Sequence, residues 1–139
     1  MANKVALRTK SREFAMQMLF QWDMSQQEPS RLESNFWKSA KGAAQTRNFA
    51  NQLFEGAAHD AKELDEIIAK YAANWRLERI AAIDRAILRL AMHEMRATDT
   101  PAKIVINEAV DLAKKFSSDE AGGFVNGILD NYRKSLNVE

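Results

Sequence analysis

The chain has 139 residues, a formal net charge of +1 and no cysteine, which excludes disulfides, cysteine-ligated zinc and any cysteine nucleophile. This length fits one domain, residues 1–139, that can bury roughly 68% of the surface its unfolded form exposes. No apolar run approaches the roughly 18 residues of a membrane span, and the start has no signal-peptide core. The sequence therefore predicts a soluble, cytoplasmic protein.

Positive charge is concentrated at the amino terminus. Residues 1–12 contain Lys4, Arg8, Lys10 and Arg12 and no acidic side chain, whereas the rest of the chain is nearly balanced. A short basic segment on a near-neutral body indicates a local contact with an anion. The alternative is a solvated, frayed terminus, and charge alone leaves both interpretations open.

Apolar residues at helical spacing predict helices through the first half of the chain, and no segment alternates as a strand does. The first helix begins within the basic segment and ends at about Met24. A short second helix starts at a capping box of Ser30 and Glu33, and Thr46 caps a third. The helical period then continues beyond residues 59–60, either in the same helix or after a bend.

The second half of the chain has stronger helical patterns. A helix over residues 80–95 places Asp84 and Arg89 on its outward face. Thr100 and Pro101 are suited to the N-cap and first position of the next helix. Six or seven helices follow from the whole pattern, so the predicted fold class is all-α, with helices packed into bundles.

An acidic connection with two glycines joins the last two predicted helices. Ser117 and Glu120 match a capping box, which places Gly122, Gly123 and Phe124 in the opening turns of the last helix. Glycine there costs helix stability, so we expect another backbone or a ligand to approach closely. Periodicity alone is also compatible with a core role for Phe124.

Most familiar site chemistry is absent from the sequence. His59 and His93 fall in different predicted helices, and neither has a second ligand at i+4, so we expect no metal site. No glycine-rich phosphate loop is present, and no cofactor is expected. What remains is a basic first helix and an aromatic ring beside glycines, the combination that single-stranded RNA recognition uses.

Three blocks of sequence, in order, resemble the NusB family of bacterial transcription antitermination factors. The blocks are residues 8–13 with the aromatic residues of the first helix, residues 84–91 with Glu94, and residues 106–110 followed by 124–130. The resemblance implies two three-helix bundles, no catalysis, and a heterodimer with NusE, the small-subunit ribosomal protein that doubles as a transcription factor. It also implies that the pair binds single-stranded boxA RNA in ribosomal RNA leaders and joins RNA polymerase, with other Nus factors, to suppress premature termination.

The resemblance implies roles for individual residues. Arg8, Lys10 and Arg12 correspond to the family's arginine-rich motif, and Phe124 corresponds to its RNA-contacting aromatic. Phe20, often tyrosine in the family, and Asp84 correspond to positions that face NusE. The RNA site expected on this basis is Lys4, Arg8, Lys10, Arg12, Gly122, Gly123 and Phe124.

The acidic connection suggests a modulating role. Asp119 and Glu120 would lie close to the RNA if Phe124 does, and carboxylates there oppose phosphates. We therefore expect these two residues to temper RNA affinity.

Two other classes of function are compatible with the sequence. Similar domains precede RNA cytosine methyltransferase domains, but this chain lacks the length, the glycine-rich loop and the cysteine of such an enzyme. It could serve at most as an RNA-targeting part. The other alternative is a protein-interaction module or self-associating scaffold without direct RNA binding, in which a homodimer covers the RNA surface.

Overall fold

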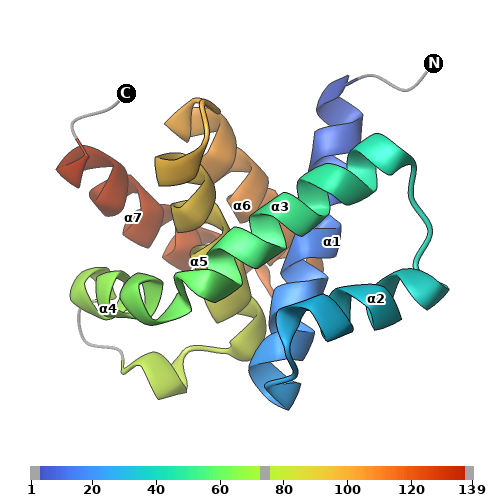
Figure 1. Ribbon diagram of the computed structural model, residues 1–139. Coiled ribbons are helices and arrows are strands. Elements are labelled where there is room, and N and C mark those ends of the chain that lie inside the picture. The colour runs from blue at the N-terminus through green and yellow to red at the C-terminus, as the bar shows by residue number, and fades with distance from the viewer. Residues whose placement is uncertain (1–3, 73–75, 137–139) are drawn as a thin grey trace.

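The computed structural model describes residues 4–72 and 76–136, and these residues form seven α-helices and one short 3-10 helix (Figure 1). No strand occurs in the described ranges, which confirms the all-α prediction. The elements are α1 (Lys4–Ser25), α2 (Pro29–Ser39), α3 (Ala44–His59), α4 (Ala61–Tyr71), η1 (Leu77–Arg79), α5 (Ala82–Ala97), α6 (Ala102–Phe116) and α7 (Asp119–Ser135).

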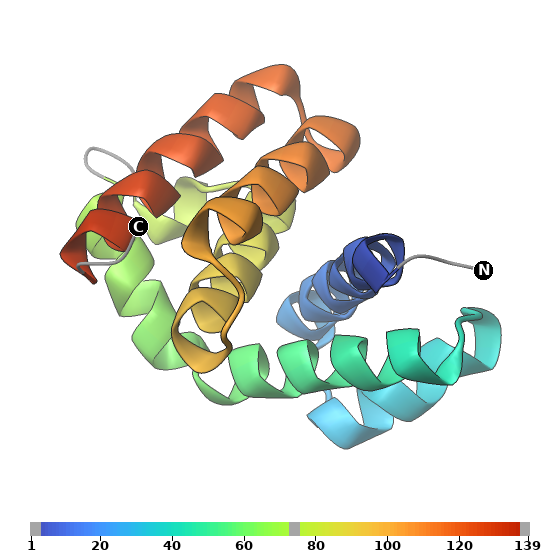
Figure 2. The same ribbon diagram turned by 90° about the horizontal axis from the view of Figure 1, so that it is seen from above.

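The helices form two bundles that share an interface. Helices α1, α2 and α3 pack together, and α5, α6 and α7 form the second group, as the view from above shows (Figure 2). Helix α4 packs against α3, α5 and α7, and both α1 and α3 contact α5. The predicted pair of three-helix bundles is thus confirmed, with α4 as a seventh helix. None of the described helices is long and apolar enough to cross a membrane.

Helix α5 is the centre of the molecule. Its residues 86–94 are all buried, and it packs against α1, α3, α4, α6 and α7. A helix surrounded on all sides buries even its polar face. This explains why Asp84 and Arg89, predicted to face outward, are only 8% and 5% exposed. The charge of Arg89 is paired with Asp65 of α4: its Nε–H donates a hydrogen bond to Oδ1, at 2.7 Å.

The predicted starts of α2 and α3 are wrong by two and three residues, because the N-caps are Glu28 and Ala43. Helix α2 begins at Pro29, so Ser30 lies inside it and forms no capping box. Thr46 lies within the first turn of α3 and is buried, and its carbonyl oxygen accepts a hydrogen bond of 2.8 Å from the hydroxyl of Ser11. Proline is favoured in the first turn of a helix because its missing N–H has no helical partner there.

The remaining boundaries settle the alternatives that the sequence left open. Helix α3 ends at His59 and α4 begins at Ala61, so the continuous period contains a bend. Pro101 is itself the N-cap of α6, one residue later than predicted, and no side chain caps this helix. The sequence also predicts a turn over residues 72–76, centred on Trp75, and residues 73–75 of that stretch lie outside the described ones.

Candidate nucleic-acid interface

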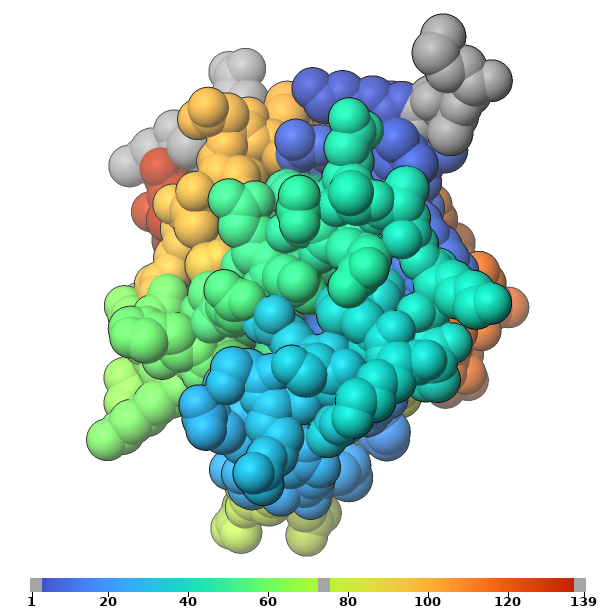
Figure 3. All heavy atoms as spheres, turned by 45° about the vertical axis from the view of Figure 1, so that its right-hand side comes forward, coloured from blue at the N-terminus to red at the C-terminus, as the bar shows by residue number. Residues whose placement is uncertain are grey.

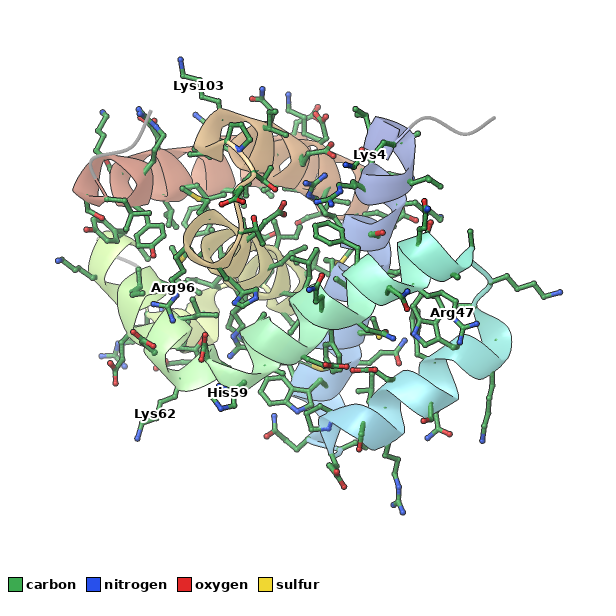
Figure 4. All side chains as sticks on the ribbon, turned by 45° about the horizontal axis from the view of Figure 1, so that its top comes forward. Lys4, Arg47, His59, Lys62, Arg96 and Lys103 are labelled. Atoms are coloured by element: carbon green, nitrogen blue, oxygen red, sulfur yellow. The ribbon has the colours of Figure 1, made fainter. Side chains whose placement is uncertain are left out.

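The first turns of α1 present two cations that make no ion pair within the described part of the chain. Lys4 is exposed (Figure 4), and Arg8 is partly buried. The guanidinium carbon of Arg8 lies 4.1 Å from the ring centroid of Phe49 on α3. Such a cation–π contact orients the side chain without neutralising its charge. Both cations therefore remain able to attract an anion.

A carboxylate joins the next basic residue of α1 to α6. Glu13 accepts hydrogen bonds from Lys10 at 2.9 Å and from Lys115 at 3.0 Å. Burial alone would raise the pKa of Glu13, but the two ammonium groups outweigh it and hold the pKa below its usual value. Both lysines are exposed, so two positive charges flank one partly shielded negative charge here.

Arg12 does not have the position predicted for it. Its residue is 4% exposed, and its guanidinium donates to both carboxylate oxygens of Glu94 and to Glu108. Thr9 donates a further hydrogen bond of 2.6 Å to Glu108. Arg12 and Arg8 are one turn apart, but only Arg8 is directed to the surface. The expected phosphate contact of Arg12 is corrected to an internal ion pair between helices.

The acidic connection forms the first turn of α7. Ser118, rather than the predicted Ser117, is the N-cap, and its hydroxyl oxygen accepts a 3.0 Å hydrogen bond from the backbone N–H of Ala121. Asp119 and Glu120 follow it, and both are exposed. Carboxylates in the first turn of a helix are stabilised by the helix dipole. They therefore stabilise α7 while placing negative charge beside Phe124.

The two glycines of α7 have different surroundings. A Cβ atom at Gly122 would lie 2.9 Å from Cγ of Lys114, so the lysine stem packs directly on this glycine. The close approach at this glycine is thus made by a side chain of α6, and not by the other backbone that the sequence predicted. Gly123 is exposed, and a Cβ atom there would meet nothing within 4 Å. Phe124 is partly buried and packs against the core at one edge.

Phe124 and Asp84 line one hollow of about 350 Å³, together with Glu120 and Arg79. Asp84 is nearly buried, and its Oδ1 finds no hydrogen-bond donor in the described chain. Burial raises the pKa of Asp84, and a hydrogen bond from Ser117 opposes this only in part. A partner that offers a donor here would remove an unfavourable feature of the free protein.

The structure separates Phe20 from Asp84. Phe20 is partly buried and lines a different hollow, of about 400 Å³, with Met24 of α1 and Leu32 and Phe36 of α2. The side chain of Met24 contributes exposed apolar surface to it, because this residue is 57% exposed. The two positions expected to face NusE thus line two different hollows.

Sequence reasoning missed the residues that connect the basic start of α1 to Phe124. Lys115 and Lys10 both donate hydrogen bonds to the carboxylate of Glu13. The stem of Lys114 packs on Gly122. The end of α6 therefore links the two predicted patches, of which the basic one lines the hollows of Arg8 and the other lines the hollow of Phe124. The signal in the sequence was the pair of adjacent lysines at the end of a predicted helix. It did not point to RNA, because the helix dipole by itself favours cations at a helix C-terminus.

No group of three or more metal-ligating side chains occurs in residues 4–72 and 76–136. The candidate site is instead an open surface of cations, carboxylates and aromatic rings on an all-helical scaffold. This defines a helical protein whose surface is suited to binding rather than to a buried reaction centre.

Comparisons with known proteins identify the family. The NusB family model matches residues 9–134, and the chain therefore belongs to the NusB family. Curated relatives include the transcription antitermination protein NusB of Koribacter versatilis, 45% identical over all of this chain and 97% of the relative. That of Bacillus velezensis is 42% identical over 93% of this chain and 97% of the relative.

Solved structures agree with the family assignment. A structure of antitermination factors NusB and NusE in complex with dsRNA matches with a TM-score of 0.83 and 28% identity, over 94% of this chain and 98% of the other. Thermotoga maritima NusB matches with a TM-score of 0.81 and 29% identity, over 91% of this chain and 90% of that chain.

Proposed function

We propose that this protein is a transcription antitermination factor that binds single-stranded boxA RNA in ribosomal RNA leader transcripts together with NusE. The pair then joins RNA polymerase, with other Nus factors, and helps it to resist premature termination. The proposal assigns no catalytic step to the chain. Family membership supports it, as does a similar NusB solved with NusE and dsRNA.

RNA binding is supported most directly by the orientation and the unpaired charge of Arg8. Its guanidinium is held over Phe49 at 4.1 Å and has no carboxylate partner among the described residues. Exposed Lys4 lines the same hollows as Arg8. Oriented cations beside an aromatic ring suit a polyanion with unstacked bases. Lys10 and Lys115, next to Glu13, extend this positive surface toward Phe124.

The partner surface follows from the two hollows near the other end of α1. Asp84 offers a buried acceptor without a donor, and the hollow beside Phe20 offers exposed apolar surface. We assign both to the NusE interface. Because Phe124 lines the hollow of Asp84, NusE bound there would lie next to RNA bound at Phe124.

Fluorescence anisotropy with labelled boxA RNA, with and without NusE, tests the proposal. Binding should tighten when NusE is present, and the logarithm of the association constant should fall with that of salt, with a slope of about −0.7 per phosphate contacted. Arg8→Ala should weaken binding and reduce the slope by one such unit. Lys62→Ala is the matched control, because Lys62 is exposed on α4, away from Lys4 (Figure 4).

Two outcomes separate the alternatives. A scaffold without direct RNA binding would leave the anisotropy unchanged in every mixture, and that result would refute the proposal. Sedimentation of the free protein tests self-association. A homodimer that dissociates as boxA RNA is added would fit an RNA surface covered between copies.

A further inference from the structure

We propose that the hollow between α1 and α3 holds an unpaired nucleotide of the RNA, and that Gln45, Asn48 and Gln52 of α3 recognise its base. This inference rests on the proposed function and extends the RNA site from α1 to α3. It assigns the choice of sequence to the amides of α3, and the general affinity for RNA to the cations of α1.

The three amides share one face of α3. Residues 45, 48 and 52 are spaced by three and four, which places them on one side of a helix. All three are exposed and line a hollow of about 510 Å³, together with Phe49 of α3 and with Lys4 and Arg8 of α1. The space-filling view shows α3 on the surface, with the first turns of α1 directly against it (Figure 3).

The electrostatics of this hollow favour an anion. None of the described residues that line it is a carboxylate, and Lys4 and Arg8 are among them. The first turn of α3 has no acidic residue and no side-chain cap, so the positive end of the helix dipole is not neutralised. A second hollow shares Lys4, Arg8, Phe49 and Gln52 with this one and is lined also by Asp99 and Glu108. A phosphate would therefore favour the first hollow.

The chemical groups match a nucleobase. An amide side chain offers both a donor and an acceptor, and the edge of an unpaired base presents both. The side-chain amides of Gln45, Asn48 and Gln52 make no hydrogen bond to another residue that the structure describes, so they are available to a ligand. The guanidinium of Arg8 is fixed by Phe49, and arginine planes stack on unpaired bases.

The test compares boxA RNA with a scrambled RNA of equal length and composition, by anisotropy at saturating NusE. The triple variant Gln45→Ala, Asn48→Ala and Gln52→Ala should lose about tenfold of the preference for boxA, because single base contacts discriminate at this level or above. Its affinity for the scrambled RNA should stay unchanged. Arg8→Ala should instead weaken both complexes together.

Asn131→Ala is the control variant. It removes an exposed amide from α7, outside the hollows assigned to RNA and to NusE, and should keep the wild-type preference. Equal thermal midpoints would show that all variants are folded. A triple variant that keeps the preference, or weakens both RNAs equally, would overturn the inference while wild-type binding still supports the proposed function. Absence of wild-type binding would overturn both.

Discussion

Arg12 of α1 and Glu94 of α5 form a two-point ion pair inside the protein. The Nε atom of Arg12 lies 2.8 Å from Oε1 of Glu94, and a terminal nitrogen lies 2.6 Å from Oε2. Glu94 is fully buried. The remaining terminal nitrogen of Arg12 donates to Glu108 of α6 at 2.7 Å. One guanidinium therefore ties the first helix to two helices of the other bundle.

We expect Arg12→Ala to destabilise the protein strongly. The substitution leaves Glu94 buried and unpaired, and breaking a buried pair in this way costs about 3–5 kcal/mol. Urea unfolding followed by circular dichroism measures this loss. Arg8→Ala should change the free energy of unfolding by less than about 1 kcal/mol, since Arg8 has only its contact with Phe49 to lose.

RNA binding by the same two variants separates their roles. The salt dependence of boxA binding by Arg12→Ala should equal that of the wild type, under conditions in which circular dichroism shows the variant to be folded. The salt dependence of binding by Arg8→Ala should be weaker. A stable Arg12→Ala protein with a flattened slope would show instead that Arg12 contacts phosphate.

The sequence predicts the helices well because apolar periodicity records which faces are buried. It cannot show which polar residues find partners across the molecule. Arg12, Asp84 and Arg89 occupy positions that periodicity assigns to solvent, yet all three are buried. Their burial depends on α5 being enclosed by other helices, and this depends on tertiary packing rather than on local pattern.

The candidate site is partly predictable for the same reason. The basic segment and the corner at Phe124 are visible as local composition. Their connection through Lys114 and Lys115 depends on contacts between residues far apart in the chain, such as Glu13 with Lys115. Helix starts also mislead, because a capping-box pattern such as Ser30 with Glu33 can fall inside a helix.

Two glycines should respond in opposite directions to alanine. A Cβ atom at Gly56 of α3 would lie 2.2 Å from the ring of His93 on α5, an impossible contact without movement of a helix or ring. We expect Gly56→Ala to cost about 1–3 kcal/mol, as overpacking does. A Cβ atom at Gly127 of α7 would meet nothing within 4 Å. Gly127→Ala should stabilise the protein by up to about 1 kcal/mol.

Thermal unfolding of the two glycine variants, side by side, makes this comparison. A double variant, Gly56→Ala with His93→Ala, should recover part of the loss if the ring is the obstacle. A midpoint for Gly56→Ala equal to that of the wild type would mean that α3 and α5 are further apart than described.

Glu33 of α2 should make stability fall as the pH rises. Burial, together with hydrogen bonding and charge from Glu55 of α3, raises the pKa of Glu33 to about 8. Two carboxyl groups share a hydrogen bond only when one is protonated, and Oε2 of Glu33 has no donor among the described residues. The folded protein holds this proton above the usual pKa, so its stabilising effect is complete below about pH 4.5 and is lost toward pH 8.

Urea unfolding at a series of pH values measures the effect. Glu33→Gln should match the wild type near pH 5 and become the more stable protein as the pH approaches 9. Glu28→Gln, which alters an exposed carboxylate at the start of α2, should follow the wild type throughout. A constant difference between wild type and Glu33→Gln would exclude a raised pKa.

Asp84→Asn should raise the free energy of unfolding and lower the affinity for NusE. Burial raises the pKa of Asp84, and Oδ1 lacks a donor, so the charged form destabilises the free protein and does so increasingly as the pH rises. The neutral amide should add about 1 kcal/mol to the free energy of unfolding at pH 7. Affinity for NusE, by calorimetry, should fall, because a donor from the partner would meet a weaker acceptor.

The control for this residue is Asp119→Asn, since Asp119 is an exposed carboxylate in the first turn of α7. It should lose a few tenths of a kcal/mol of helix-dipole interaction and leave NusE affinity unchanged. Stronger NusE binding by Asp84→Asn would contradict the assignment of this hollow to the partner.

Phe124 should contribute to RNA binding through its aromatic character. Stacking of one base on an aromatic ring is worth about 1–3 kcal/mol, so Phe124→Leu should weaken boxA binding roughly tenfold while keeping most of the apolar contact with the core. Anisotropy measures the first effect and urea unfolding the second. Phe124→Ala should lose stability as well as affinity, because the ring is partly buried.

Glu120→Gln provides the comparison of opposite sign. Glu120 is exposed and lines the same hollow as Phe124, so removing its charge should tighten boxA binding, most clearly at low salt where repulsion of phosphates is least screened. A core-only role for Phe124 predicts a different pattern. Phe124→Leu would then bind RNA as the wild type does, and Phe124→Ala would differ from it only in its unfolding midpoint.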